Sequence, residues 1–147
     1  MQPLSAFNFS VRLLLDGEQR PICDGAFSEV TGLEASIETQ TIREGGNNAR
    51  QIHLMGRVSY GQATLKRGLT RGLDLWTWFN AVNGRRDLRA SGEIVLLSGD
   101  RESETIRFIL TGCLPMKLKM PSLNATDGIV AIEEMQIAYE TLDVRAA

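Results

Sequence analysis

The sequence contains 147 residues, of which 43% are apolar and 23% are charged, and its formal net charge is −2. These values predict a single globular domain, residues 1–147, with enough chain to bury a core. The acidic balance argues against a general nucleic-acid-binding protein. No apolar run approaches the roughly 20 residues that span a bilayer, so we expect no direct membrane anchor.

Residues 1–9 lack a basic stretch followed by an apolar one, so we expect no secretory signal and synthesis in the cytoplasm. Export would then need lysis or a dedicated route. The two cysteines, Cys23 and Cys113, are too few for a disulfide framework and are interpreted as reduced thiols. With a single histidine, His53, and no Cys-x-x-Cys motif, the sequence predicts no metal site and no cofactor.

The first predicted strand covers residues 7–15, where apolar and polar side chains alternate. Its apolar face carries Phe7, Phe9, Val11, Leu13 and Leu15. Asp16 and Gly17 then indicate a turn. Residues 20–23 are expected to pair back as a short strand, with Pro21 at an edge or at the strand start.

Residues 34–43 form a strand-like stretch whose two faces are both too polar for a monomer core. One face carries Ala35, Ile37, Thr39 and Thr41, and the other carries Glu34, Ser36, Glu38 and Gln40. Such a strand has no strong register signal within its own chain. We therefore expect that another molecule, or water in a wide cavity, accounts for its polarity.

The next segment combines a loop with a further strand. Residues 44–48 form a predicted loop, because their glycines and asparagines tolerate positive φ at low cost. Residues 49–57 show no regular pattern and are expected to be irregular. A strand is predicted over residues 58–67, with Gly61 as a bulge or a point of close approach.

Only one segment has a clear helical period, and it predicts a helix at about residues 72–83. Its apolar positions follow the spacing i, i+3, i+4 and i+7 and are Leu75, Trp78, Phe79 and Val82. Thr70 or Gly72 is expected to cap its start, and Asn83 with Gly84 suits its end.

The second half of the chain predicts strands at residues 88–97, 104–111 and 114–120. Residues 129–144 fit a strand with one slip, although their periodicity alone slightly favours a helix. With no internal repeat, the expected class is mainly β, an antiparallel β-sandwich or small barrel with one flanking helix.

No known catalytic motif occurs, so we expect no enzyme. His53 is interpreted as a polar loop residue and Cys113 as an inert buried thiol. The acidic cluster Asp100, Glu102 and Glu104 lacks the ligand spacing of a calcium loop and is interpreted as a solvated turn.

Two basic groups are open to a functional interpretation. Arg85, Arg86 and Arg89 either form a solvated helix end or contact an acidic neighbouring subunit. Lys117 and Lys119 project from one strand face and belong either to plain surface or to an assembly surface.

Three blocks of the sequence resemble a known family. FSEVTGLEASIETQTIREGGNN, ATLKRGLTRGLDLWTWFNAV and MPSLNATDGIVAIEEMQIAYETLDV resemble, in order, the blocks of contractile-tail tube proteins. These include the tail tube proteins of myophages and the inner tube proteins of extracellular contractile injection systems. The type VI secretion tube protein is a more distant relative. The likeness covers about residues 7–144, and its motifs are structural signatures.

The resemblance implies a β-sandwich or partial barrel that completes a multi-subunit β-barrel when rings assemble. Hexameric rings would stack into a hollow tube that a contracting sheath drives through a target envelope, conducting cargo or DNA. Partners would be other copies of the chain, sheath, spike and baseplate proteins, and tape-measure or cap proteins. The particle would be a virion or an extracellular injection device. The resemblance also favours a strand for the closing segment.

Three sets of residues are candidates for roles in such a tube. Contacts between subunits or stacked rings are expected from Glu44, Gly45, Gly46, Asn47, Asn48 and Arg50. The barrel wall or lumen is expected to include Glu34, Ser36, Glu38, Gln40, Gln62, Thr64 and Lys66. The outer or sheath-facing candidates are Arg85, Arg86 and Arg89.

Two alternatives stay open. One is a specialised tube paralogue that joins the tube to the spike and baseplate. The other, from a different class, is a monomeric small-molecule-binding β-barrel, which would need an apolar interior pocket. The polar stretch 34–43 argues against the second.

Overall fold

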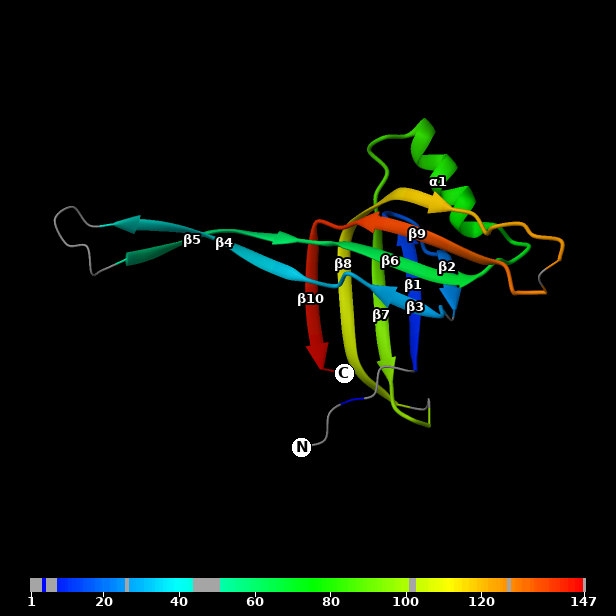
Figure 1. Ribbon diagram of the computed structural model, residues 1–147, viewed down its shortest axis with the longest axis horizontal. Helices are drawn as coiled ribbons and strands as arrows, with labels where there is room; N and C mark the ends of the chain where they lie inside the picture. The colour runs from blue at the N-terminus through cyan, green and yellow to red at the C-terminus, as the bar shows by residue number, and fades with distance from the viewer. Residues whose placement is uncertain are drawn as a thin grey trace.

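The computed structural model describes residues 4, 8–25, 27–43, 51–100, 103–126 and 128–146 (Figure 1). Within these residues the chain is built mainly of strands. In chain order the elements are β1 (Phe9–Leu15), β2 (Pro21–Gly25), β3 (Glu29–Thr31), β4 (Ala35–Arg43), β5 (Gln51–Tyr60), β6 (Gln62–Gly68), helix α1 (Asp74–Gly84), β7 (Ala90–Leu97), β8 (Glu104–Lys119), β9 (Ile132–Ala138) and β10 (Thr141–Ala146).

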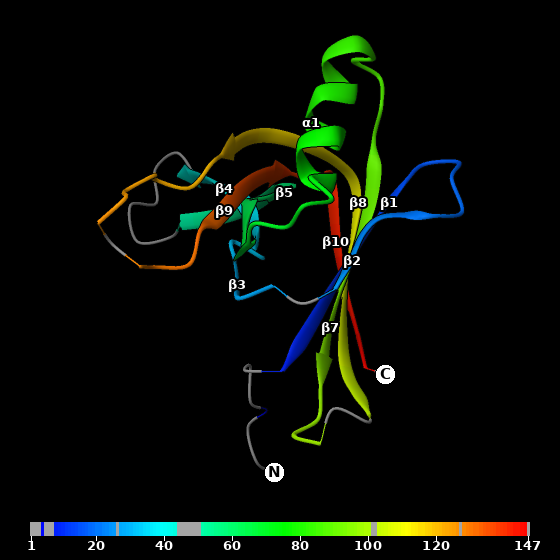
Figure 2. The same cartoon turned by 90° about the vertical axis from the view of Figure 1, so that its right-hand side faces the viewer.

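Eight of the strands form one antiparallel sheet in the order β2-β1-β7-β8-β9-β6-β3, with β10 also paired to β8. The first part of β8 pairs with β7 and β10, and its last part, residues 114–119, pairs with β9. Strand β8 therefore joins two layers, whose strands run in different directions in Figures 1 and 2. The mainly β, antiparallel class that the sequence predicts is confirmed.

The bend in β8 depends on Gly112, whose φ is +62°. A Cβ atom at this position would meet the side chain of Glu140, and the left-handed region favours glycine in any case. The sequence predicts two strands here, at 104–111 and 114–120. The structure instead has one strand of 16 residues that continues through the glycine.

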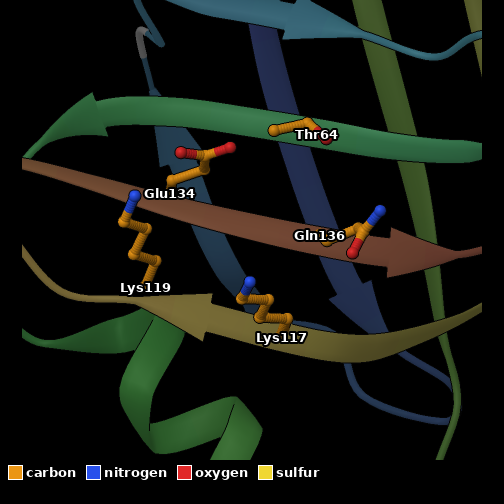
Figure 3. A pocket seen from close by; sticks show the side chains of 5 residues that line it. All are labelled: Thr64, Lys117, Lys119, Glu134 and Gln136. Atoms are coloured by element: carbon orange, nitrogen blue, oxygen red, sulfur yellow. The ribbon is translucent and has the colours of Figure 1, made fainter.

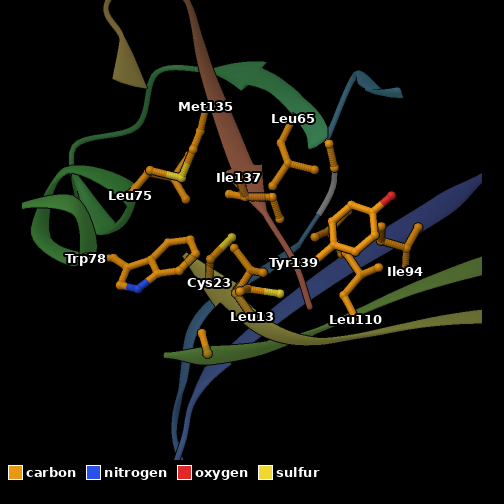
Figure 4. Packing of buried hydrophobic residues seen from close by; sticks show 14 of the residues in the cluster. Leu13, Cys23, Leu65, Leu75, Trp78, Ile94, Leu110, Met135, Ile137 and Tyr139 are labelled. Atoms are coloured by element: carbon orange, nitrogen blue, oxygen red, sulfur yellow. The ribbon is translucent and has the colours of Figure 1, made fainter. Parts of the chain in front are cut away.

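The core lies between the two layers and under α1 (Figure 4). Leu13 from β1, Leu65 from β6, Leu110 from β8 and Ile137 from β9 are each at most 1% exposed. Trp78 of α1 closes one end of this cluster. The alternation predicted for residues 7–15 is confirmed at Val11 and Leu13, and β2 pairs back on β1 as expected.

Helix α1 begins two residues later than the predicted start at about residue 72, and neither Thr70 nor Gly72 is its N-cap. The N-cap is Leu73, with φ 51° and ψ 36°, and it makes no side-chain capping bond. Asp74 takes over part of that role, because its Oδ1 accepts the Leu75 N–H at 2.9 Å. Leu75 and Trp78 face the core as predicted.

Strands β4 and β5 form a separate two-stranded sheet that extends away from the body as a hairpin (Figure 1). The prediction that residues 49–57 are irregular was wrong, since β5 covers Gln51–Tyr60. The single strand predicted over 58–67 is in fact two strands, separated at Gly61. The loop residues 44–48 and Arg50 lie outside the described residues.

The closing segment forms strands β9 and β10, as the family resemblance implies and against the local helical period. Met135, Ile137 and Tyr139 are buried at alternate positions, which is the period of a strand. The short break between the two strands, next to Glu140, hides this period when the sequence is read alone.

Candidate functional site

A polar face covers the outer side of β6, β9 and the last part of β8. Along β6, Ala63, Leu65 and Arg67 are buried, whereas the alternate residues Gln62, Thr64 and Lys66 point away from the core. Figure 3 shows Thr64 of β6 beside Glu134 and Gln136 of β9 and Lys117 and Lys119 of β8. These five side chains line a shallow cavity of about 270 Å³. We call the seven residues Gln62, Thr64, Lys66, Lys117, Lys119, Glu134 and Gln136 the polar face.

The polar face is held together by contacts between oppositely charged or amide side chains. Lys66 Nζ lies 3.2 Å from Glu29 Oε2. A hydrogen bond to Glu29, with the nearby charges of Glu29 and Glu134, raises the pKa of Lys66 above its ordinary value. Gln136 Nε2 donates to Gln62 Oε1 at 2.9 Å. Such a surface suits contact with water rather than a core.

The seven predicted barrel-wall residues fall into two groups. Gln62, Thr64 and Lys66 lie together on the polar face with Lys117 and Lys119, for which the sequence left open a place on plain surface or on an assembly surface. Glu34, Ser36, Glu38 and Gln40 lie on or beside β4 in the separate hairpin. All four are exposed, and the Ser36 hydroxyl lies 3.0 Å from that of Ser59 on β5.

The hairpin also carries five exposed apolar side chains, two of which, Leu54 and Met55, lie in the stretch 49–57 that the sequence predicts to be irregular. The exposed fractions are 47% for Ile37, 47% for Ile42, 46% for Leu54, 76% for Met55 and 50% for Val58. Within the described residues, β4 and β5 pair only with each other. A two-stranded hairpin is marginal in water, so this one is a strong candidate for contact with another molecule.

A second exposed apolar segment lies between β8 and β9. Leu123 is 92% exposed, and Ile129 and Val130 are each 75% exposed. Ile129 and Val130 also help to line a groove of about 260 Å³. In Figure 1 this connection and the β4–β5 hairpin extend from opposite ends of the molecule. The chain therefore exposes apolar surface at both ends of its long axis.

The predicted outer residues Arg85, Arg86 and Arg89 follow α1 and lie away from the polar face. Arg85 makes a long contact of 3.9 Å with Asp87. Arg89 Nη1 donates to the carbonyl oxygens of Arg86 and Leu88, at 2.8 and 3.0 Å. Arg89 is therefore used within its own loop, whereas Arg85 and Arg86 are exposed.

A buried ionic network anchors α1 to the sheet, and sequence reasoning missed it. Arg67 is 8% exposed and Glu133 is 1% exposed, and Arg67 Nε lies 2.7 Å from Glu133 Oε1. The same guanidinium pairs with Asp74 at the start of α1. It also lies over the ring of Phe27, 5.2 Å from the centroid. The only feature of the sequence that pointed to this network was Arg67, a charged residue at a buried position of the alternating strand β6.

Sites for chemistry are few in the described part of the chain. No group of three or more His, Cys, Asp or Glu residues there is placed to hold a metal ion. No helix among those residues is long and apolar enough to cross a membrane. Burial is the main cause that raises the pKa of the Cys113 thiol to about 12, so this thiol is poorly suited to act as a nucleophile.

Several solved structures are similar to this chain. A chain in the baseplate of the anti-feeding prophage is 27% identical, with a TM-score of 0.86 over 99% of this chain and 97% of that one. A chain of the PVC sheath–tube complex, an extracellular contractile injection system in its extended state, is 22% identical, with a TM-score of 0.84 over 99% and 93%. Hcp1 from Flavobacterium johnsoniae is 14% identical, with a TM-score of 0.54 over 94% and 96%.

The likeness at 22% and 14% identity concerns the fold alone. No curated protein matches the sequence significantly. The model of one family, described as the T4-like virus tail tube protein gp19, matches residues 5–143. This family is structural rather than enzymatic, in agreement with the missing catalytic motifs. Because the match spans nearly the whole sequence, the chain belongs to the family of the T4-like virus tail tube protein gp19.

Proposed function

We propose that this chain, as one domain, is the repeating subunit of the hollow inner tube of a contractile injection particle or phage tail. Six copies form a ring, and rings stack into a tube that sheath contraction drives through a target envelope. The observation that carries the proposal is the β4–β5 hairpin. It has no sheet partner among the described residues and exposes five large apolar side chains.

The polar face is proposed to line the lumen. It stands on the opposite side of the sheet from the core, and it carries amide and charged groups of both signs. A water-filled bore needs such a wall. Cargo or DNA would pass along it. Of the predicted wall residues, Gln62, Thr64 and Lys66 belong to this face, and Glu34, Ser36, Glu38 and Gln40 are proposed to contribute from the hairpin.

The two ends of the long axis are proposed to form the contacts between stacked rings. The hairpin of one subunit would approach the β8–β9 connection of a subunit in the next ring, so that both apolar segments leave water together. Contacts of this heterologous kind repeat without limit along an axis. Glu44, Gly45, Gly46, Asn47, Asn48 and Arg50, which lie outside the described residues, remain candidates for the same contact. Arg85 and Arg86, with Arg89, remain candidates for contact with a sheath protein.

A second candidate function within the family is a tube paralogue next to the baseplate, where spike proteins would be its partners. It is favoured by one finding, the similarity to a chain of a baseplate structure at 27% identity. The two candidates differ in length of assembly. A main tube subunit forms long tubes by itself, whereas a baseplate paralogue stops at one ring or a short stack.

Negative-stain electron microscopy of the purified full chain tests the proposal. We expect rings in end view, with sixfold symmetry in class averages, and tubes of uniform bore at high protein concentration. Analytical ultracentrifugation over a range of concentrations supplies the mass of the ring. A species that stays monomeric at the highest concentrations would refute the tube function, and rings that never elongate would favour the baseplate paralogue.

A further inference from the structure

Helix α1 carries two tryptophans with opposite environments. Trp78 is 1% exposed and packs in the core, whereas Trp76 is 46% exposed. The Trp76 ring stacks on Phe79, with ring centroids 6.3 Å apart and an interplanar angle of 14°. Exposed, pre-positioned aromatic side chains are typical anchors of protein interfaces. The outer side of α1 is therefore a contact surface that the functions described above have not used.

This aromatic surface borders an unpaired strand edge. Trp76 and Phe79 line a groove of about 280 Å³ whose other lining residues are Asn80, Val82, Asn83 and Pro115. Pro115 belongs to the last part of β8, residues 114–119, which pairs with β9 on one side and with no other described strand. A proline, which has no N–H, is tolerated at such an edge.

The last part of β8 forms one layer with β9, β6 and β3, in that order. The β3 edge of this layer, opposite the β8 edge, shows a matching arrangement. Strand β3 pairs with β6 and with no further strand in the described chain. On its core side lies an apolar groove of about 120 Å³ lined by Phe9, Val30, Leu33, Ile94, Leu96 and Phe108. Figures 1 and 2 both place α1 at the upper end of the molecule and β3 well below it.

The strand directions allow these two edges to meet. Strands β8, β9, β6 and β3 are each antiparallel to the next, so the two edge strands of this four-stranded layer run in opposite directions. The β3 edge of one copy therefore lies antiparallel to the β8 edge of another copy related by rotation. Helix α1 lies on the core side of the layer, where Leu75 and Trp78 pack. It would then cover the apolar groove behind β3.

We propose that the Trp76–Phe79 surface of α1 docks on the groove behind β3 in a second copy of this chain, with Trp76 as the anchor. The proposal rests on the proposed tube function and adds the contact between neighbours within one ring. Each copy uses both surfaces, one toward each neighbour, which closes a ring without leaving an exposed strand edge.

Tryptophan fluorescence tests this contact, because the chain has only two tryptophans. The Trp76→Phe variant reports Trp78 alone, and subtraction from the unmodified protein isolates Trp76. We expect acrylamide to quench Trp76 readily in dilute protein and several-fold less in assembled rings, with Trp78 unchanged. The Trp76→Ala variant should raise the concentration for half-assembly by at least about tenfold, as truncation of an aromatic anchor does.

Thr77→Ala is the matched control, since Thr77 is exposed on the same helix but lines a different groove. It should assemble as the unmodified protein does. Rings in which Trp76 stays as quenchable as in the monomer would overturn this contact while leaving the tube function intact. Protection of Trp76 only after a different protein is added would overturn it as well. A chain that never assembles would overturn both proposals.

Discussion

The hydroxyl of Tyr139 accepts a hydrogen bond from the backbone N–H of Glu34 at 3.0 Å. It donates in turn to the carbonyl oxygen of Gly32 at 2.8 Å. Tyr139 follows β9, and Glu34 lies just before β4, so one side chain fixes the base of the projecting hairpin to the body. Tyr139 is 6% exposed, which shields these bonds from water.

The Tyr139→Phe variant should therefore lose about 1–2 kcal/mol of unfolding free energy, because two backbone polar groups lose their partner. We also expect weaker assembly, since the hairpin is no longer held at one angle. Urea unfolding measures the first effect and sedimentation the second. Tyr60→Phe is the matched control, because its ring lies 6.0 Å from that of Tyr139. Equal losses in both variants would contradict a specific role for the Tyr139 hydroxyl.

The sequence predicts the strands with clear alternation and the apolar face of α1, because these depend on local period. It does not predict the continuous β8, since Gly112 breaks the pattern while the strand bends through it. Residues 51–57 of β5 were not predicted as strand, because this strand is exposed at almost every position and a strand without a buried face shows no alternation of apolar and polar residues. The surface made by Gln62 and Lys117 depends on strand order, which no local pattern contains.

The buried pair of Arg67 and Glu133 leads to a second prediction. Glu133→Leu should destabilise the fold by about 3–5 kcal/mol, because it leaves a buried guanidinium with less compensation. The pair is 2.7 Å apart and almost fully buried. The guanidinium of Arg67 would keep its pair with Asp74 at the start of α1 but lose its buried partner. Chemical denaturation followed by circular dichroism gives the free energy of unfolding.

The double variant Arg67→Met with Glu133→Leu is the control for that experiment. It removes both charges, so it should be more stable than the single variant Glu133→Leu, since an apolar replacement of a buried pair is often close to neutral. A double variant that is less stable than either single variant would contradict the idea that the unpaired charge causes the loss.

Cys113 leads to a prediction on pH. Burial raises the pKa of its thiol from 9.0 to about 12, so the folded state keeps the proton to higher pH than the unfolded state. The resulting contribution to stability is complete below about pH 9 and is lost as pH rises from 9 toward 12. The midpoint of urea unfolding should therefore fall less steeply with pH between 9 and 12 in Cys113→Ala than in the unmodified protein. An unchanged slope would contradict the assigned cause.

Alkylation gives an independent measurement on the same thiol. Cys113 is buried and protonated at pH 8, so iodoacetamide should label it only after unfolding in urea. Peptide mass spectrometry distinguishes it from Cys23. Rapid labelling of Cys113 in the folded protein at pH 8 would show that the site opens to solvent.

The last prediction concerns the exposed apolar residues of the hairpin. Met55 is 76% exposed in β5, so Met55→Asp should change the unfolding free energy of the monomer by no more than about 0.5 kcal/mol. The same variant should block tube formation, because a charge would have to leave water at the contact between rings. Thermal unfolding of dilute protein and electron microscopy of concentrated protein separate the two effects.

Thr41→Asp provides the control for charge alone, since Thr41 is an exposed polar residue of the paired strand β4. It adds the same charge to the same hairpin without removing an apolar side chain. We expect it to assemble far better than Met55→Asp, and Met55→Leu to assemble normally. If Thr41→Asp blocks tubes as completely as Met55→Asp, repulsion between hairpins rather than loss of an apolar contact governs stacking.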